Sequence, residues 1–488
     1  MGQQSLKEKT AKGLFWGGFS NGMQQLLNLF FGIIIARILN ASDYGMIGML
    51  AIFSAVAVTL QESGFTAALA NKRNVTHEDY NAVFWFCTFT GLTLYVILFF
   101  SAPLIADFYN KPELVPLARF VFLGFLISST ATAHNAALFR NLMVKQKALS
   151  QVPALAISGI VGILMAYNNM SYWGIATQSI VYIAVVNLCF WYYSPWRPTW
   201  KIDFRPLKGL FGFSSKILLT NVFTQTNNNL LSTLLGRYYS TNEVGYYTQS
   251  SKWNYMGYSF INGMISSVAQ PVLAEIADDP QRQLNVFRKM LRFTSFIAFP
   301  AMLGLTLITR ELIIITITDK WLPCVPILQI LCIWGAFVPI SNLYSNLIIS
   351  KGKSNLYMWN TIVVGILLLA AMILSHPYGI ITMLILFVSI NIGWLFIWQY
   401  FVGKLIPLTL WDALKDILPF AFIAGGTMIA TYFITSGIEN IYLLFTGKIV
   451  IAATIYIFIL WISKAAILKE SLGFLAGRWK KTTRKKNT

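Results

Sequence analysis

Apolar runs separated by short polar connections recur along the whole chain of 488 residues. Each run reaches roughly 20 residues, the length at which a helix rising about 1.5 Å per residue crosses a hydrocarbon core of about 30 Å. We therefore predict an all-α polytopic membrane protein with about fourteen transmembrane helices. They are expected at 13–39, 44–70, 80–105, 114–138, 148–168, 172–194, 209–236, 245–271, 285–309, 323–349, 355–375, 379–402, 413–435 and 441–467. No connection between them is long enough to form a soluble domain.

The composition agrees with this pattern. Apolar residues make up 56% of the chain and charged residues 11%, whereas about a quarter of the residues in soluble domains are charged. The net charge of +19 and the basic segment "RWKKTTRKK" (478–486) raise the possibility of nucleic-acid binding. When successive connections are assigned to opposite sides, however, most of the 37 Lys and Arg residues fall on one side. This positive-inside pattern predicts that both termini are cytoplasmic and that there is no nucleic-acid partner.

A ten-residue motif occurs twice, as "ARILNASDYG" at 36–45 and as "GRYYSTNEVG" at 236–245. An even number of predicted helices separates the copies, so the chain returns to the same side of the membrane and the halves are predicted to be parallel repeats. Transporters built from such repeats handle their substrate where the halves meet. We expect two lobes of about six helices each, at 1–208 and 209–403, and an extra helix pair with a basic tail at 404–488.

Amide side chains recur within the repeat at helical spacing. The first predicted helix carries Asn21, Gln25 and Asn28, and the matching helix of the second half carries Asn221, Gln225 and Asn228. The spacing of i, i+4 and i+7 places each trio on one helical face. An amide that faced lipid would cost a few kcal/mol for each unmet group, so each face must meet protein or water. Two interpretations are open: hydrogen bonding between helices, or a hydrated cavity lined by both trios.

Few ionisable side chains fall deep within the predicted helices. Lys252 and Glu62 do, and an intramembrane ionisable residue is by default a functional candidate. We interpret Lys252 as a candidate substrate ligand and Glu62 as a candidate for ion coupling or gating. Glu62 is alternatively a snorkelling side chain or an ion-pair partner near the cytoplasmic side. His134 is expected to be a hydrogen-bonded structural residue, and the spacing of the 4 cysteines predicts neither a metal site nor a cofactor.

Three segments resemble one known family. "ARILNASDYG", "QESGFTAALANKR" (61–73) and "TDKWLPCVPILQIL" (318–331) are similar to Wzx-type polysaccharide flippases. These form the polysaccharide-transport branch of the superfamily that also contains MATE-type multidrug exporters and lipid II flippases. The resemblance implies two six-helix lobes around a central cavity, followed by two further helices. It also implies a flippase that moves an undecaprenyl-diphosphate-linked oligosaccharide from the inner to the outer leaflet of the bacterial inner membrane by alternating access, for O-antigen, capsule or exopolysaccharide biosynthesis.

The resemblance also implies ligands and partners. The cavity cations of such flippases correspond to Lys252 and, less closely, to Lys216 at the start of the predicted helix 209–236. The amide trios would contact the same substrate. The implied partners are the lipid-linked oligosaccharide, membrane lipid, and a polysaccharide polymerase or assembly protein.

Two other functions are weighed against this one. A cation-coupled MATE-type multidrug exporter would need a buried carboxylate as its ion site, for which Glu62 is the candidate. A membrane glycosyltransferase or polymerase would need paired acids or a general base on the outer face. The outer connections "NASD" (40–43) and "YNNMS" (167–171) are short and carry no carboxylate pair. We therefore do not expect an enzyme.

The predicted topology can be tested with reporter tags. Tags at Asn110 and Asn440 should report the outer side, and tags at Lys147, Lys353 and the C-terminus should report the cytoplasm, because the charge asymmetry sets the orientation. Paired reporters that are active on only one side of the membrane measure this. A C-terminal tag on the outer side would contradict the even number of helices.

Overall fold

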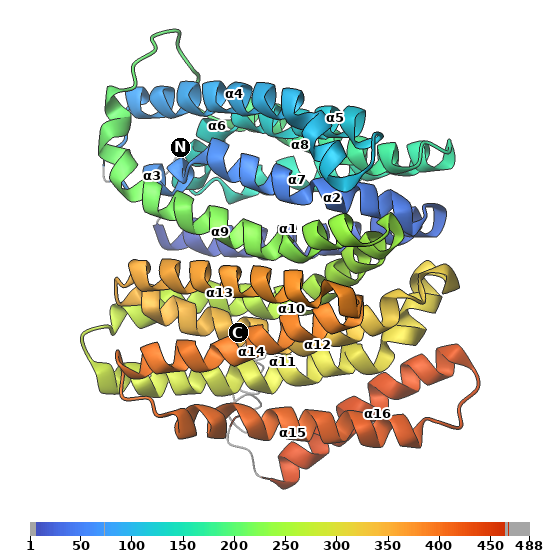
Figure 1. Ribbon diagram of the computed structural model, residues 1–488. Coiled ribbons are helices and arrows are strands. Elements are labelled where there is room, and N and C mark those ends of the chain that lie inside the picture. Colours follow the sequence, from blue (N-terminus) through green and yellow to red (C-terminus); the bar gives the residue numbers. More distant parts are fainter. Residues whose placement is uncertain (1–5, 73, 464–466, 468–488) are drawn as a thin grey trace, which may run out of the picture. The chain divides into compact units, whose positions relative to one another are not determined.

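The computed structural model describes residues 6–72, 74–463 and 467, without the side chains of residues 6–15, 67, 70–71 and 209–217. Every element in this part of the chain is helical (Figure 1). The elements are α1 (Leu6–Ile38), α2 (Ala41–Glu62), α3 (Phe65–Asn71), α4 (His77–Tyr109), α5 (Leu114–Ser129), α6 (Thr132–Arg140), α7 (Val144–Tyr167), α8 (Tyr172–Tyr193), η1 (Arg205–Leu207), α9 (Lys208–Tyr238), α10 (Thr241–Glu275), α11 (Pro280–Ile317), η2 (Asp319–Trp321), α12 (Cys324–Ser350), α13 (Ser354–Ser375), η3 (His376–Tyr378), α14 (Ile380–Gly403), α15 (Leu410–Ile434) and α16 (Ile441–Ile462).

Two of the predicted continuous helices are broken in the structure. The segment expected at 44–70 divides into α2 and α3 at Ser63 and Gly64, which both adopt left-handed backbone conformations. The segment expected at 114–138 divides into α5 and α6, which bend by 44° at Thr130 and Ala131. Apolar patterning alone did not predict these breaks, because the residues on both sides of each break are apolar enough to continue a span.

Ten helices among the described residues are long and apolar enough to cross a membrane, and the bent pair α5 and α6 makes up to eleven. Helices α1, α9 and α10 are 33, 31 and 35 residues long but are not among them. Amide and hydroxyl side chains interrupt their apolar stretches, as in "TQTNNN" (224–229). The structure is thus an all-helical membrane protein, and the count of fourteen spans stays a prediction.

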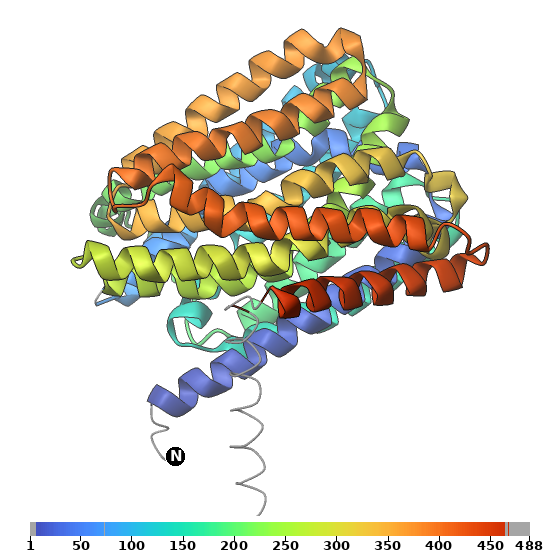
Figure 2. The same ribbon diagram turned by 90° about the horizontal axis from the view of Figure 1, so that it is seen from below.

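The chain divides into two compact units. The first comprises residues 1–248 with Thr361–Ile373, and the second comprises Gln249–Asn360 with residues 374–488. In the first unit, α1 packs on α7 and α9 packs on α2; in the second, α11 packs on α12, α15 and α16. Figure 2 shows α15 and α16 side by side. The predicted lobes at 1–208 and 209–403 and the helix pair at 404–488 stay predictions, because these units group helices by contact rather than by repeat.

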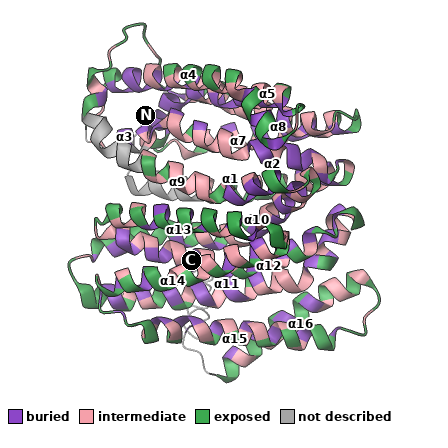
Figure 3. Cartoon of the chain, viewed as in Figure 1, coloured by how far each residue is buried: buried purple, intermediate pink, exposed green. Residues whose placement is uncertain are grey.

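Large apolar side chains are exposed along the outer faces of several helices, which appear green in Figure 3. Phe100 and Leu104 on α4 are 74% and 69% exposed, and Phe422 on α15 is 72% exposed. Exposed apolar surface of this extent is unfavourable in water but matches the hydrocarbon of a bilayer. These faces are therefore consistent with helices that meet lipid.

The repeated motif builds the same helix start twice. In the first copy, the backbone N–H of Asn40 donates to the Asp43 carboxylate at 2.9 Å as α2 begins. In the second copy, the backbone N–H of Ser240 donates to the Glu243 carboxylate, also at 2.9 Å, at the start of α10. Each acid satisfies one of the backbone donors that a helix start leaves without a partner. The shared spacing of the two copies therefore reflects the same capping requirement.

The two copies of the motif also pack against each other within the first unit. A Cβ atom added at Gly45 would overlap the backbone carbonyl of Thr241, and one added at Gly245 would overlap the backbone carbonyl of Ala41. The contact is reciprocal, since the same two positions of each copy take part. Glycine is required at both sites because the obstructing atoms belong to backbone that has little room to shift. The glycine at the end of each motif thus permits α2 and α10 to approach closely.

We predict that Gly45→Ala lowers the stability of the protein by roughly 1–3 kcal/mol, because the added methyl group overpacks this contact. The matched control is Gly22→Ala, at a helical glycine with open space around it. The control should be neutral or more stable by up to about 1 kcal/mol, since alanine favours helix. Thermal unfolding of the purified proteins measures both. Equal stability of the two variants would contradict the close approach.

Candidate functional site

The amide trio of α1 lies on an exposed face of the helix. Asn21, Gln25 and Asn28 are all exposed, and none of their side chains has a hydrogen-bond partner among the described residues. A different amide holds α1 to its neighbour, because Gln24 donates to Gln151 on α7 at 3.4 Å. The trio is therefore not the part of α1 that hydrogen-bonds to another helix.

The amide trio of α9 resembles that of α1 in its exposure and hydrogen bonding. Asn221 and Asn228 are exposed and Gln225 is half-buried, and their side chains have no hydrogen-bond partner in the described part of the chain. Here Asn227 provides the contact between helices, since its Nδ2 donates to the backbone carbonyl of Thr361 on α13 at 2.9 Å. In both repeats, one amide outside the trio bonds to a neighbouring helix and the trio itself is left available.

Of the two predicted cations, only Lys252 has a side chain among the described residues. Lys252 lies half-buried on α10 in the second unit, and its ammonium forms no hydrogen bond or ion pair with a described residue. Ser250, two residues earlier on α10, donates to the carbonyl of Cys324 on α12 at 3.1 Å. Lys252 is therefore a half-buried charge without a protein partner among the described residues. The side chain of Lys216 lies outside the described residues.

Glu62 and His134 lie near the helix breaks of the first unit. Glu62 is half-buried at the end of α2 and lines a cavity of about 210 Å³. His134 is fully buried, but the expectation that it is hydrogen-bonded was wrong for the described residues, since neither ring nitrogen has a partner. It instead contacts Trp191 and Trp196, with ring centroids 4.4 and 5.2 Å away. Its structural role is therefore aromatic packing.

The connection between α8 and α9 is hydrogen-bonded to α4. Asn81 accepts from the backbone N–H of Thr199 at 2.8 Å and donates to the carbonyl of Lys201 at 2.6 Å. Further along the connection, hydrogen bonds from Arg205 lower the pKa of the Asp203 carboxyl to about 2. This exposed pair stays ionised throughout the physiological range.

A buried ion pair was missed by the sequence analysis. Lys448 of α16 donates to the Glu311 carboxylate of α11 at 2.8 Å, and the two side chains are 8% and 6% exposed. The Lys448 ammonium also donates to the carbonyl of Leu307 at 3.2 Å. Glu311 was overlooked because the helix predicted at 285–309 in fact continues to Ile317. Lys448 could have been found as a single charge inside an apolar helix.

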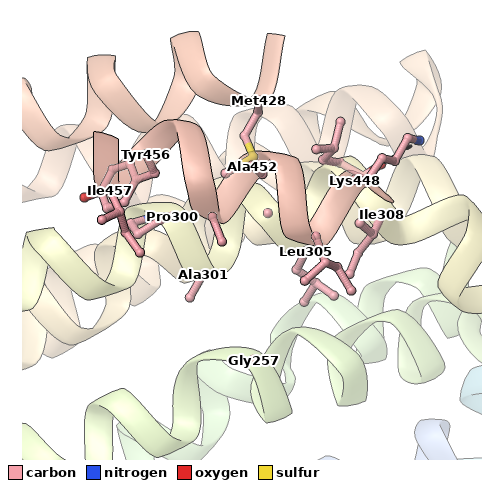
Figure 4. Close-up of a pocket in the computed structure, with 14 residues that line it drawn as sticks. Gly257, Pro300, Ala301, Leu305, Ile308, Met428, Lys448, Ala452, Tyr456 and Ile457 are labelled. Carbon is pink, nitrogen blue, oxygen red and sulfur yellow. Dashed lines mark hydrogen bonds between the residues drawn. The ribbon is translucent and has the colours of Figure 1, made fainter. Parts of the chain in front are cut away.

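An apolar cavity of about 460 Å³ adjoins this ion pair. Figure 4 shows Pro300, Leu305 and Ile308 of α11 on one side and residues of α16 on the other, with Lys448 at one end and Tyr456 at the other. Its lining is almost entirely hydrocarbon, with the lysine as the only charged group among the lining residues. A cavity of this chemistry accommodates a hydrocarbon chain.

A second ion-pair network ties α15 to the same helix. Arg288 of α11 donates through Nε to Asp416 at 2.7 Å and contacts Asp412 at 3.1 Å. Arg292 adds a longer contact to Asp416 at 3.5 Å. Both helices of the C-terminal pair are thus anchored to α11 by ion pairs.

The helical arrangement matches that of a solved membrane protein. A solved structure of the lipid II flippase MurJ in an inward closed conformation superimposes with a TM-score of 0.76 over 92% of this chain and 99% of that chain, at 17% identity. At this identity the likeness establishes the fold alone. The chain therefore has the same fold as MurJ.

The family follows from the sequence comparisons. Residues 34–326 match the family of polysaccharide biosynthesis proteins, and the chain belongs to this family. It is 25% identical to an uncharacterised membrane protein of the cps region of Klebsiella pneumoniae, over 96% of this chain and 98% of that protein. It is also 25% identical to the lipopolysaccharide biosynthesis protein WzxC of Escherichia coli, over 72% of this chain and 71% of WzxC.

These findings confirm the predicted resemblance to Wzx-type polysaccharide flippases. They also confirm the prediction of a transporter rather than an enzyme. The MATE-type exporter, which the sequence analysis kept as an alternative, is not favoured by them.

We predict that Lys448→Met alone destabilises the protein by roughly 3–5 kcal/mol, because it leaves the buried Glu311 carboxylate unpaired. The double variant Lys448→Met/Glu311→Gln should recover most of this loss. Thermal unfolding in detergent measures both. The control is Arg205→Ala, which breaks an ion pair whose arginine is 90% exposed and should change stability by about 1 kcal/mol or less. A single variant as stable as this control would contradict the role of the pair.

Proposed function

We propose that the protein is a flippase that moves a lipid-diphosphate-linked oligosaccharide from the inner to the outer leaflet of the bacterial inner membrane. A string of sugar hydroxyls does not cross hydrocarbon unaided, since each unpaired hydroxyl costs about 4–8 kcal/mol on alkane-like scales and a charge far more. The protein would supply a polar path in place of hydrocarbon. The relatives named for polysaccharide and lipopolysaccharide biosynthesis support this substrate class.

The exposed amide trios are the observation that carries the proposal. An amide in contact with lipid leaves hydrogen-bonding groups unmet, and in both repeats the contact between helices is made by another residue, Gln24 or Asn227. The trios therefore fit a hydrated path better than a packing seam. Amides donate and accept at once, which suits the hydroxyl groups of sugars. We assign the trios of α1 and α9 to the oligosaccharide.

Lys252 is assigned to the diphosphate. An ammonium without a described protein partner carries a desolvation cost in the membrane that an anionic ligand would offset. Lys216 is proposed as a second, weaker contact on the grounds of the family resemblance. An inside-negative membrane potential would favour outward movement of the anion by about 2.3 kcal/mol per charge per 100 mV.

Movement is proposed to follow alternating access. The reciprocal glycine contact between the starts of α2 and α10 joins equivalent points of the two motif copies and is made mainly by backbone atoms. Such a contact is suited to form in one state and separate in another, because packed interfaces are bistable rather than continuously deformable. We further propose that the chain forms fourteen spans in two lobes and that both termini are cytoplasmic.

The proposed substrate indicates what this transport step delivers and which proteins would use it. The product would be a lipid-linked repeat unit on the outer leaflet, ready for a polymerase or assembly protein of O-antigen, capsule or exopolysaccharide biosynthesis. The apolar cavity beside α16 fits a hydrocarbon chain, so membrane lipid or the carrier lipid is proposed to occupy it.

The hydrated path predicts selective thiol labelling. In a background without the four native cysteines, Gln25→Cys and Gln225→Cys should react with a small membrane-impermeant thiol reagent, because both positions would face water. Phe100→Cys on the exposed apolar face of α4 is the control and should stay unlabelled. Failure of both glutamine positions to react in every condition tested would assign the trios to packing.

If Lys252 binds the diphosphate, its removal should impair transport without changing the stability of the protein. Lys252→Ala should abolish export of surface glycan while expression and melting temperature stay unchanged. Lys252→Arg should keep much of the activity, since the charge is preserved although its donor geometry differs. Lys353→Ala, at an exposed lysine in a connection, is the matched control. A stable Lys252→Ala protein with normal surface glycan would contradict the assignment.

A further inference from the structure

The cavity beside Glu62 lies where two broken helices meet. The α2–α3 break contributes Glu62 and Thr66 to its lining, and the α5–α6 break contributes Ala131 and Thr132. The short helices that follow the two breaks, α3 and α6, pack against each other, and α8 closes a further side. In transporters, discontinuous helices of this kind commonly form the binding sites of coupling ions.

Side-chain hydrogen bonds stabilise the break between α5 and α6. Ser128, Ser129 and Thr130 each donate a hydroxyl to a carbonyl three residues earlier in α5. From α8, Asn187 donates through Nδ2 to the carbonyl of Ile127 at 2.5 Å. The same nitrogen donates to the Thr130 hydroxyl at 2.7 Å. Because a carbonyl only accepts, these contacts fix the orientation of the Asn187 amide.

This orientation leaves acceptor oxygens of the lining without partners. Asn187 Oδ1 is buried and unpartnered, and so are Asn135 Oδ1 and Thr66 Oγ1. All three residues line the cavity. A buried oxygen without a hydrogen-bond donor is unfavourable, and a cation could satisfy all three.

The lining also carries one carboxylate. Glu62 forms no ion pair with a described residue, although the Lys147 ammonium of α7 interacts with it electrostatically. Gln61 is already engaged, since its Nε2 donates to Thr132 at 2.8 Å and its Oε1 lies 3.3 Å from the Ser128 hydroxyl oxygen. The available groups are therefore a carboxylate and three oxygens.

We infer that this cavity binds a monovalent alkali cation, with Na⁺ as the probe. Oxygen ligands suit hard cations, and one carboxylate balances one positive charge. The carboxylate and the acceptor oxygens disfavour an anion, and no group of three or more His, Cys, Asp or Glu side chains that could hold a metal ion occurs among the described residues. A volume of about 210 Å³ holds an ion with several water molecules, each of which occupies about 30 Å³ in the liquid.

Binding is tested by the melting temperature of the purified full chain in NaCl against N-methyl-D-glucamine chloride at equal ionic strength. The wild-type protein should be stabilised by Na⁺ in a saturable way. Glu62→Gln and Thr66→Val should each weaken the apparent affinity for Na⁺ by about tenfold or more, which corresponds to about 1.4 kcal/mol. Thr66→Val removes a hydroxyl that makes no hydrogen bond, so the variant should fold.

Thr88→Val is the matched control. Thr88 Oγ1 is also buried without a partner, but Thr88 does not line the cavity, so this variant should keep the wild-type response to Na⁺. Equal melting temperatures in the two salts would overturn the inference, as would a wild-type response in both Glu62→Gln and Thr66→Val. Stabilisation that follows pH without a response to Na⁺ would assign a proton to Glu62 and overturn the alkali-cation site. The measurement uses no glycan, so its failure would leave the proposed flippase function standing.

Discussion

The hydrocarbon core of a bilayer offers no hydrogen-bond partner, so every polar group within it must be satisfied by the protein or face water. This constraint explains most polar features of the chain. The Lys448–Glu311 pair satisfies two charges at once, and the hydroxyl groups at the α5–α6 break satisfy carbonyls that the break releases. Among the described residues without such partners are the exposed amide trios of α1 and α9 and three buried oxygens of residues that line the cavity at Glu62. These places are where function is proposed.

The duplicated motif shows how one short sequence meets two demands. Its acid caps a helix start, in Asp43 and again in Glu243. Its final glycine, Gly45 or Gly245, permits the other copy to approach. A repeat that caps its own helix and packs on its own duplicate would be preserved in both halves for the same physical reasons.

Much of the fold could be predicted from the sequence, since helix-length apolar runs and the motif spacing are local signals. The helix breaks could not, because Ser63 and Thr130 lie within runs that are apolar enough to continue. The Lys448–Glu311 pair joins residues 137 positions apart, which no local pattern reveals. Periodicity placed each amide trio on one face but did not show what lies opposite. Glu62 was singled out as a deep charge, whereas its oxygen-lined surroundings depend on the packing of α3, α6 and α8.

The most direct test of the central claim is transport by the purified protein in liposomes. A fluorescent lipid-diphosphate-linked oligosaccharide is incorporated in both leaflets, and a membrane-impermeant glycosidase is added outside. If the protein is a flippase, the pool of substrate protected in the inner leaflet of the liposomes should become accessible over time, while empty liposomes keep it protected. A protected pool that is the same with and without the protein would contradict the account.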